Sequence, residues 1–422
     1  MDAIFGLDFG TTNSALAVNE GGAVRIIDAD PFNTTGKTLR SILFFDKASH
    51  VYVGQEAISH YIEDDATGRL IQSIKTFLTS TNFNTTNINK RPYQLDDLVS
   101  VILRKLKKRG EDDLGYDVPS VVLGRPAVFS ENPEADALAE ERLRSAAIKA
   151  GFKNVFFQFE PVAAALAFEA SLKPGEEKII LVGDFGGGTS DFTVIRLRGG
   201  NLNVGDRKGD ILSLGGVYIG GDTFNSRIMW HRIVPYFGSN SKLKGMRGQW
   251  LDAPRYLFTT LCQWHLISQL REKKDRESIR QIRVQSDDPE AIKRLEELVD
   301  QNYGFRLFQA IEKAKCELSS MSTSRIVFHE GLASINKDIT QDNIEKMIQD
   351  DLVKITQCVE ETVKNSGLTA SEIDTVFITG GSSYVPCIRK IFETTFGKDK
   401  VRSADAFTSV VHGLGLTASH LR

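Results

Sequence analysis

The chain has 422 residues, of which 41% are hydrophobic and 25% charged, a composition typical of a soluble globular protein with room for two sizeable cores. Its formal net charge of −3 gives no electrostatic reason to expect nucleic acid or an anionic membrane as a partner. There is no secretory leader pattern, no apolar run of about 18 residues and no Cys-x-x-Cys pair among the four cysteines, so we expect a soluble cytoplasmic protein without a zinc site.

The first half of the chain is predicted to alternate strands and helices. Residues 1–30 have the apolar pattern of a strand meander, and the polar stretch 79–90 is expected to form an exposed loop within a small inserted subdomain. Helical periodicity covers 95–108, a strand is expected at 118–124, and 133–150 is a helix rich in Ala, Glu and Arg.

The second half is predicted to continue the same alternation. A glycine-rich turn at 215–221 leads into a helix that begins near Asp222. Residues 240–310 are charged and mostly helical, with charge runs that indicate solvated faces rather than binding sites. An amphipathic helix at 344–365 is followed by a buried strand at 375–379.

Two segments, 4–14 and 181–191, carry nearly the same pattern. In each, an apolar strand ends in an aspartate, turns through glycines and meets hydroxyl side chains before a second apolar strand. Glycines let backbone N–H groups approach an anion, and Thr and Ser add donors. Because Asp8 and Asp184 would repel phosphate, their expected task is to hold a cation, most simply hydrated Mg²⁺, against it. The duplication favours this metal role over turn aspartates that cap their own loops.

Three other kinds of nucleotide site are not supported. The pattern G-x-x-x-x-G-K-[ST] does not occur, which argues against a strand-to-helix P-loop. Asp-Phe-Gly occurs twice, but no catalytic loop of the H-R-D-x-x-x-x-N type accompanies it, so a protein kinase is rejected. Residues 413–418 fit G-x-G-x-x-A, yet no βαβ unit follows them, so we expect no dinucleotide site there.

Three more segments have features that a nucleotide cleft needs. Glu160 precedes Pro161 and a run of small residues, and a proline at a helix start is preorganised, so this carboxylate is placed to contact a metal's water shell. The glycine turns at 220–222 and 380–382 offer backbone N–H groups at helix N-termini, which attract phosphate or ribose oxygens.

Six motifs in this order resemble the actin-like ATPase superfamily, and specifically the nucleotide-binding domain of the heat-shock protein 70 family, the DnaK type of chaperone. The resemblance runs from Ile4 to about Thr417. It implies an α/β protein of the actin-like (ribonuclease H-like) ATPase fold, with a mixed sheet and helices in each of two lobes and ATP or ADP with Mg²⁺ in the cleft between them. The motifs lie at 6–14, 160–165, 184–191, 220–224, 312–319 and 380–383.

By the same resemblance, each lobe is a two-segment core interrupted by an inserted subdomain. The expected ranges are 1–174 for lobe I, with core 1–38 and 96–174 around an insertion at about 39–95, and 175–422 for lobe II, with core 175–219 and about 343–422 around a helical insertion at about 220–342.

The resemblance also implies catalytic roles. Asp8 and Asp184 would hold the hydrated Mg²⁺ through water, and Glu160 and Asp191 would orient the attacking water and the metal's water shell. Lys75 matches the family's catalytic lysine, which would neutralise charge on the transferring phosphoryl group. The alternative for Lys75 is an exposed lysine on an amphipathic helix.

Further positions are implied to contact the nucleotide. Expected at the phosphates are Gly10, Thr11, Thr12, Asn13, Gly186, Gly187, Gly188 and Thr189; expected elsewhere on the nucleotide are Gly220, Gly221, Asp222, Glu312, Lys315, Cys316, Ser319, Gly380, Gly381, Ser382, Tyr384 and Asp405. Pro126 resembles the switch proline that links nucleotide state to lobe orientation.

The sequence departs from the family pattern in two ways. Cys316 and Tyr384 stand where the family has two arginines that sandwich the adenine, which removes cation–π contacts of roughly 0.5 to 2 kcal/mol each, although Tyr384 could stack on one face of the base. In addition, no acidic-leucine linker and no β-rich peptide-binding domain follow residues 410–422. A natural lack of that domain and a truncation both remain open.

The function expected from these motifs is slow ATP hydrolysis coupled to lobe closure on a partner, in the manner of a chaperone. Its partners would be the nucleotide and a protein client or co-chaperone. Three alternatives remain: an actin-like filament-forming ATPase, which residues 312–319 and the insertion at 240–310 disfavour; a small-molecule kinase, for which no acidic base beside a substrate pocket is recognisable; and a nucleotide-binding pseudo-ATPase, which Cys316 and Tyr384 favour.

Overall fold

The computed structural model describes residues 3–33, 36–64, 67–130, 132–200, 207–245, 248–263, 266–403, 408–419 and 421. The chain divides into two compact units. Unit 1 comprises Met1–Tyr218, Lys354–Ser383 and Arg389–Arg422, and unit 2 comprises Ile219–Val353 and Tyr384–Ile388. Within the described ranges, no helix is both long and apolar enough to cross a membrane. The lobe boundary expected near residue 175 stays a prediction.

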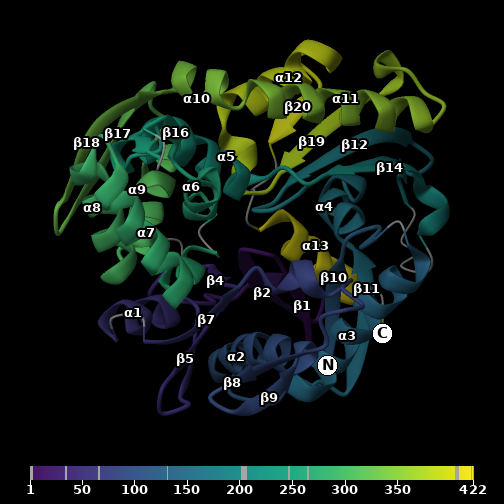
Figure 1. Ribbon diagram of the computed structural model, residues 1–422. Helices are drawn as coiled ribbons and strands as arrows, with labels where there is room; N and C mark the ends of the chain where they lie inside the picture. The colour runs from purple at the N-terminus through teal and green to yellow at the C-terminus, as the bar shows by residue number, and fades with distance from the viewer. Residues whose placement is uncertain are drawn as a thin grey trace. The chain divides into compact units, whose positions relative to one another are not determined.

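Unit 1 contains two large sheets with the same strand arrangement (Figure 1). Each begins with a three-stranded antiparallel meander. The first strand of the meander pairs with a parallel strand, which in turn pairs with a second parallel strand. The first sheet has the order β11 (Asn154–Phe159), β10 (Ser120–Arg125), β1 (Ile4–Phe9), β2 (Asn13–Glu20), β3 (Ala23–Ile26), with β4 (Thr38–Arg40) paired to β2. The second has the order β14 (Ile211–Val217), β13 (Ser190–Arg198), β12 (Glu177–Phe185), β19 (Thr375–Thr379), β20 (Val401–Ser403). The predicted meander and the strand at 375–379 are confirmed.

Helices alternate with these two sheets in layers. Helices α2 and α3 pack on one face of the first sheet in a single apolar core, and α4 and α13 lie between the two sheets in a second core. Helices α11 and α12 cover the outer face of the second sheet, where Phe392 contacts Phe185 with ring centroids 5.8 Å apart. The helices are α2 (Leu95–Leu114), α3 (Pro133–Ala150), α4 (Glu160–Glu169), α11 (Gln349–Asn365), α12 (Pro386–Phe396) and α13 (Ser409–Ala418).

Glycines allow the two central helices to approach their neighbours closely. A Cβ on Gly413 of α13 would lie 1.9 Å from the carbonyl oxygen of Ala163 in α4, and a Cβ on Gly6 of β1 would lie 2.5 Å from the backbone nitrogen of Gly415. Asn19 of β2 donates from Nδ2 to the Gly415 carbonyl at 2.8 Å. The G-x-G spacing at 413–415 therefore serves helix and sheet packing.

Smaller sheets complete unit 1, and one of them corrects a prediction. Helix α1 and the strands β5, β6 and β7 form one layer, while β8 and β9 form a hairpin in the region expected to be a loop at 79–90. Asn89 and Lys90 adopt positive φ of 50° and 67°, as a two-residue hairpin turn requires. The bounds are β5 (Ile42–Asp46), β6 (Val51–Val53), α1 (Gln55–Glu63), β7 (Gly68–Gln72), β8 (Thr85–Ile88) and β9 (Arg91–Gln94).

Unit 2 is mainly helical, as expected for residues 240–310. Helix α5 continues into a π-helical turn at Met229–Ile233, and a long hairpin of β17 and β18 pairs residue by residue from Thr323 and Thr340 to Glu330 and Ala333. The elements are α5 (Gly221–Ile228), β15 (Lys242–Lys244), β16 (Trp250–Asp252), α6 (Arg255–Leu261), α7 (Lys273–Gln285), α8 (Pro289–Asp300), α9 (Gly304–Glu317), β17 (Thr323–Glu330), β18 (Ala333–Thr340) and α10 (Gln341–Met347).

Three further helix predictions have different outcomes. Helix α3 has the predicted range, because Asn132 caps its first N–H groups and Gly151 ends it with φ of 105°. Helix α2 runs beyond 108 and ends at Gly115. The single helix predicted at 344–365 is wrong, since Ile348 separates α10 from α11.

Candidate functional site

The two glycine hairpins have the same register. In the first, β1 and β2 pair Asp8 with Ala15 and Phe9 with Ser14. In the second, β12 and β13 pair Asp184 with Asp191 and Phe185 with Ser190. Each aspartate thus lies one residue before the end of its strand, and a turn of three or four residues follows the strand.

The glycine turns come together within unit 1. A Cβ on Gly188 would lie 4.0 Å from the Thr11 methyl, so the second turn faces the first. Gly380, with φ of 82°, passes so close to the second hairpin that a Cβ would lie 2.7 Å from Asp184 Oδ1. Only glycine adopts that conformation in that space. Ser382, in the 3₁₀ turn Gly381–Tyr384, donates from Oγ to the Gly186 carbonyl at 3.2 Å.

Four carboxylates and one ammonium group lie within electrostatic reach of one another at these turns. They are Asp8, Glu160, Asp184, Asp191 and Lys75, which we call the carboxylate cluster. Lys75 Nζ donates to Glu160 Oε1 at 2.8 Å, and the two side chains are 13% and 11% exposed. Lys75 is thus a largely buried, paired residue of the 3₁₀ turn Ile74–Phe77 rather than an exposed one on an amphipathic helix.

The cluster carries more negative charge than its lysine can balance. Burial raises the pKa of Asp8 to about 7 and of Asp184 to about 8, and the charge of Glu160 adds to both shifts. Burial likewise raises the pKa of Asp191 to about 6, against the hydrogen bond that it accepts from Thr189 Oγ1 at 2.9 Å. Burial alone would lower the pKa of Lys75, but Glu160 and Asp8 raise it above its usual value.

These residues fit a cation held through its own water. Among the described residues no group of three or more His, Cys, Asp or Glu side chains is placed to hold a metal ion directly. Oxygen donors of this kind suit Mg²⁺, which keeps several of its waters when bound by one or two carboxylates. Thr12 Oγ1 in the first turn is buried without a hydrogen-bond partner, as a group prepared for an oxyanion or a metal-bound water would be.

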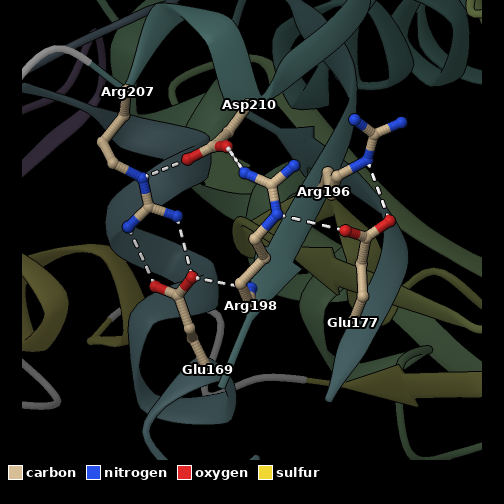
Figure 2. Close-up of polar contacts among 6 residues, drawn as sticks. All are labelled: Glu169, Glu177, Arg196, Arg198, Arg207 and Asp210. Atoms are coloured by element: carbon tan, nitrogen blue, oxygen red, sulfur yellow. Dashed lines mark hydrogen bonds and ion pairs between the residues drawn. The ribbon is translucent and has the colours of Figure 1, made fainter. Parts of the chain in front are cut away.

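Helix α4 carries Glu160 into the cluster and is fixed at both ends. At its start, Glu160 Cγ lies so close to β10 that a Cβ on Gly124 would be 3.1 Å away. At its end, Glu169 accepts both Nη groups of Arg207 at 2.8 and 2.9 Å, and both side chains are almost fully buried (Figure 2). Arg207 also pairs with Asp210 at 2.5 Å, and Glu169 accepts the Arg198 backbone N–H at 3.1 Å.

The same ion network continues along the second hairpin. Arg198 of β13 bridges Asp210 and Glu177 at 3.4 and 3.1 Å, and Arg196 lies 3.1 Å from Glu177 (Figure 2). Sequence reasoning missed this network, because no spacing rule connects residue 169 with residue 207.

Comparisons with known proteins match nearly the whole chain. The family model described as Hsp70 protein matches residues 4–95, 79–247 and 288–421. The chain belongs to the Hsp70 family. The chaperone protein DnaK of Thermosipho africanus (strain TCF52B) is 28% identical over 426 residues, covering 99% of this chain and 59% of that relative. DnaK of Methanothermobacter thermautotrophicus is 26% identical over 422 residues, which cover 98% of this chain and 59% of that relative. The chain therefore spans about three-fifths of the length of these relatives.

Membership in the Hsp70 family gives the chain the actin-like ATPase fold, as the sequence motifs predicted. The motifs at 6–14 and 184–191 become the two hairpins, and the motif at 160–165 becomes the start of α4. The roles assigned to individual site residues stay predictions.

The Hsp70 positions expected to bind the rest of the nucleotide lie partly in unit 2. Lys315 of α9 donates to the Gly221 carbonyl at the start of α5, at 3.1 Å, so two of these segments meet. Gly220 is the N-cap of α5. The remaining ones in unit 2 are Asp222 in α5, Glu312 and Cys316 in α9, Ser319 after α9, and Tyr384.

At the two positions that depart from the Hsp70 pattern, Cys316 is exposed and not in a disulfide, and Tyr384 is 42% exposed. Asp405 lies outside the described residues. Pro126, the predicted switch proline, directly follows β10 next to the buried Arg125.

Proposed function

We propose that this chain is a Mg²⁺-dependent ATPase of the Hsp70 type that hydrolyses ATP slowly and acts on a partner protein through nucleotide-dependent lobe closure. The observation that carries the proposal is the carboxylate cluster beside two glycine turns in unit 1. Turn N–H groups supply donors for phosphate oxygens, and the carboxylates supply the negative field that retains a hydrated cation.

Each cluster residue has a task that its placement supports. Asp8 and Asp184 would hold the water shell of Mg²⁺, which when bound neutralises phosphate charge and polarises the phosphoryl group. Their raised pKa values are consistent with this task, because a bound cation would favour the charged carboxylates that burial disfavours. Glu160 and Asp191 would orient the attacking water.

Lys75 would stabilise negative charge that develops in the transition state. Its ammonium group is held by Glu160 and also interacts with Asp8 and Asp184, so its position is fixed before the nucleotide binds. A preorganised charge of this kind lowers the barrier without a reorganisation cost.

A chaperone-like action rests on the relatives. The DnaK proteins matched are named chaperones, but this chain covers only 59% of their length. A protein client or co-chaperone is accordingly part of the proposal.

The decisive test measures phosphate release and ATP affinity with the purified chain. Lys75→Ala should lower turnover by about 10²-fold, the scale of one lost electrostatic contact, while calorimetry still detects ATP binding. Lys105→Ala is the matched control, because Lys105 pairs with Glu56 at 3.2 Å on the surface of the same unit with a side chain 45% exposed. Equal turnover of Lys75→Ala and the parent would refute the proposed mechanism.

A nucleotide-binding pseudo-ATPase is the second candidate, favoured by Cys316 and Tyr384. ATP that binds without phosphate release in the parent would support it. In either case, Cys316→Arg together with Tyr384→Arg should tighten ATP binding by roughly 1 to 3 kcal/mol, the sum of two partly desolvated cation–π contacts. Equal or weaker affinity would show that the base is held in another way.

A further inference from the structure

Unit 2 has a pocket that is open to solvent, called the cavity below, at the junction of its π-helical turn and the β17–β18 hairpin. The cavity measures about 360 Å³ and is lined by His231, Arg232, Pro235, Lys337 and Asp338. Arg232 belongs to the turn Met229–Ile233, and Lys337 and Asp338 belong to β18. A water fills about 30 Å³ of liquid, so this cavity has room for a hydrated polyatomic ion.

The π-helical turn builds one wall of the cavity. A π turn inserts an extra residue into a helix, is rare, and frequently occurs at functional sites. Here it directly extends α5 and ends where the 3₁₀ turn Val234–Phe237 begins, whose second residue, Pro235, has no N–H to donate. The backbone carbonyl of Arg232 accepts Lys337 Nζ at 2.9 Å, which ties the turn to the hairpin.

The two cations in the wall have only backbone partners. Arg232 donates from Nη2 to the Asp338 carbonyl at 2.8 Å, and Lys337 donates from Nζ to the Arg232 carbonyl. Within the described ranges, neither residue forms an ion pair with a carboxylate. Arg232 Nε is buried and has no acceptor.

The one acidic side chain in the wall is already neutralised. Asp338 accepts Arg325 Nε at 2.6 Å across the hairpin. The cavity wall therefore carries the uncompensated charges of Arg232 and Lys337, next to the exposed imidazole of His231. Burial, together with the positive charge of Arg232, lowers the pKa of Lys337, so the two cations are held close enough to repel each other.

We propose that this cavity is a binding site for a phosphate-type oxyanion. The anion would accept hydrogen bonds from the Arg232 guanidinium group, which has donors beyond the one it gives to the Asp338 carbonyl, and from Lys337 Nζ, which has donors beyond the one it gives to the backbone. It would relieve the repulsion between the two cations. Both inorganic phosphate and the phosphate group of a monoester have this chemistry. The site lies wholly within unit 2 and is independent of the carboxylate cluster.

The test measures binding of inorganic phosphate and of glycerol phosphate to the full chain at low ionic strength, with the protein kept in Mg·ADP. Arg232→Gln and Lys337→Gln should each weaken phosphate binding by about tenfold, the effect of losing one charge-assisted hydrogen bond. Lys346→Gln is the matched control: it removes the same charge from α10 of unit 2, where Lys346 pairs with Asp342 and is 72% exposed. Its affinity should stay within about twofold of the parent.

A measurement without substitution keeps the proposal testable if a variant fails to fold. The Nε–H resonance of Arg232 should shift with phosphate concentration, along the same saturation curve as calorimetry. Binding of inorganic phosphate alone would assign the site to the free ion, and binding of both probes would assign it to phosphoryl groups in general. The proposal would be overturned if the parent and Arg232→Gln bound phosphate with equal affinity, or if the Nε–H resonance did not shift with phosphate concentration.

Discussion

The two glycine hairpins of unit 1 share a backbone but differ in charge. In both, an aspartate followed by a buried phenylalanine ends the first strand, in the same strand register. Opposite its aspartate, however, the first hairpin has Ala15, while the second has Asp191. One hairpin brings one carboxylate to the cluster and the other brings two.

The positions that the two hairpins share determine the shape of the turn, and the position at which they differ changes the number of carboxylates beside it. The repeated aspartate, glycine and hydroxyl positions build the same turn twice, so they set where phosphate oxygens and a cation would lie. The unmatched carboxylate of Asp191 sits beside Asp184, whose pKa is raised furthest. Under the proposed function, both hairpins would hold the cation, and the second would add Asp191 as one of the two groups that orient water.

The largest expected effect tests the equivalence of the two hairpins. Asp8→Asn and Asp184→Asn should each reduce Mg²⁺-dependent phosphate release by about 10²-fold or more, because each removes a charge that retains the hydrated cation. Steady-state phosphate release at saturating Mg·ATP measures this. Asp64→Asn, at an exposed residue after α1, should leave it unchanged. A variant of either hairpin with full activity would show that the duplicated aspartates are not functionally equivalent.

The two hairpins also differ in the ion pairs at their ends away from the turns. The second is held by the buried Arg207, and the first by the half-exposed Arg25, which pairs with Asp113 at 2.7 Å. Arg207→Leu should destabilise the protein by about 3 kcal/mol, because it leaves the buried Glu169 without a counter-charge and leaves Asp210 with Arg198 alone. Arg25→Leu should cost less than about 1 kcal/mol. Equal unfolding midpoints in urea for the two variants would contradict the comparison.

A smaller effect should appear in the pH dependence of stability without Mg²⁺ or nucleotide. The folded-state pKa of Asp191 is about 6, above the ordinary unfolded value of about 3.9. The folded state therefore binds more protons between these values, and stability falls as the pH rises through this window. Asp191→Asn removes this loss and should exceed the parent in stability by about 3 kcal/mol at pH 7.5.

Denaturant unfolding in EDTA at several pH values measures this difference. It should fall below about 1 kcal/mol at pH 4, close to the unfolded pKa, and approach zero only at lower pH, where Asp191 is protonated in both states. A difference that does not vary with pH would mean that Asp191 does not titrate in the range that its burial implies.

Local patterns made much of this fold predictable. Asn132 and Gly151 mark both ends of α3, and the aspartates of the hairpins are visible as a repeat, because each of these signals lies within a few residues of its effect. The strand β19 has the predicted range because its apolar run ends at Gly380.

The parts that the sequence did not reveal depend on contacts between distant residues. Lys75 and Glu160 are 85 positions apart, and only the family resemblance placed Lys75 at the site. The pairing of Glu169 with Arg207 and the cavity beside Arg232 have no local signal at all. The hairpin of β8 and β9 was missed because its strands are polar, and its Asn89–Lys90 turn carries no glycine.

The contact of α13 with β1 and α4 sets an order for folding during synthesis. Gly6 meets Gly415 after more than 400 residues of chain have been made, so the central layer of unit 1 stays incomplete on the ribosome until α13 emerges. Contacts between such distant residues form slowly. Unit 2, which is nearly continuous from Ile219 to Val353, has most of its own partners available earlier. The helical insertion should therefore reach a protease-resistant state first, while the strands that carry Asp8 and Asp184 wait for the final helix.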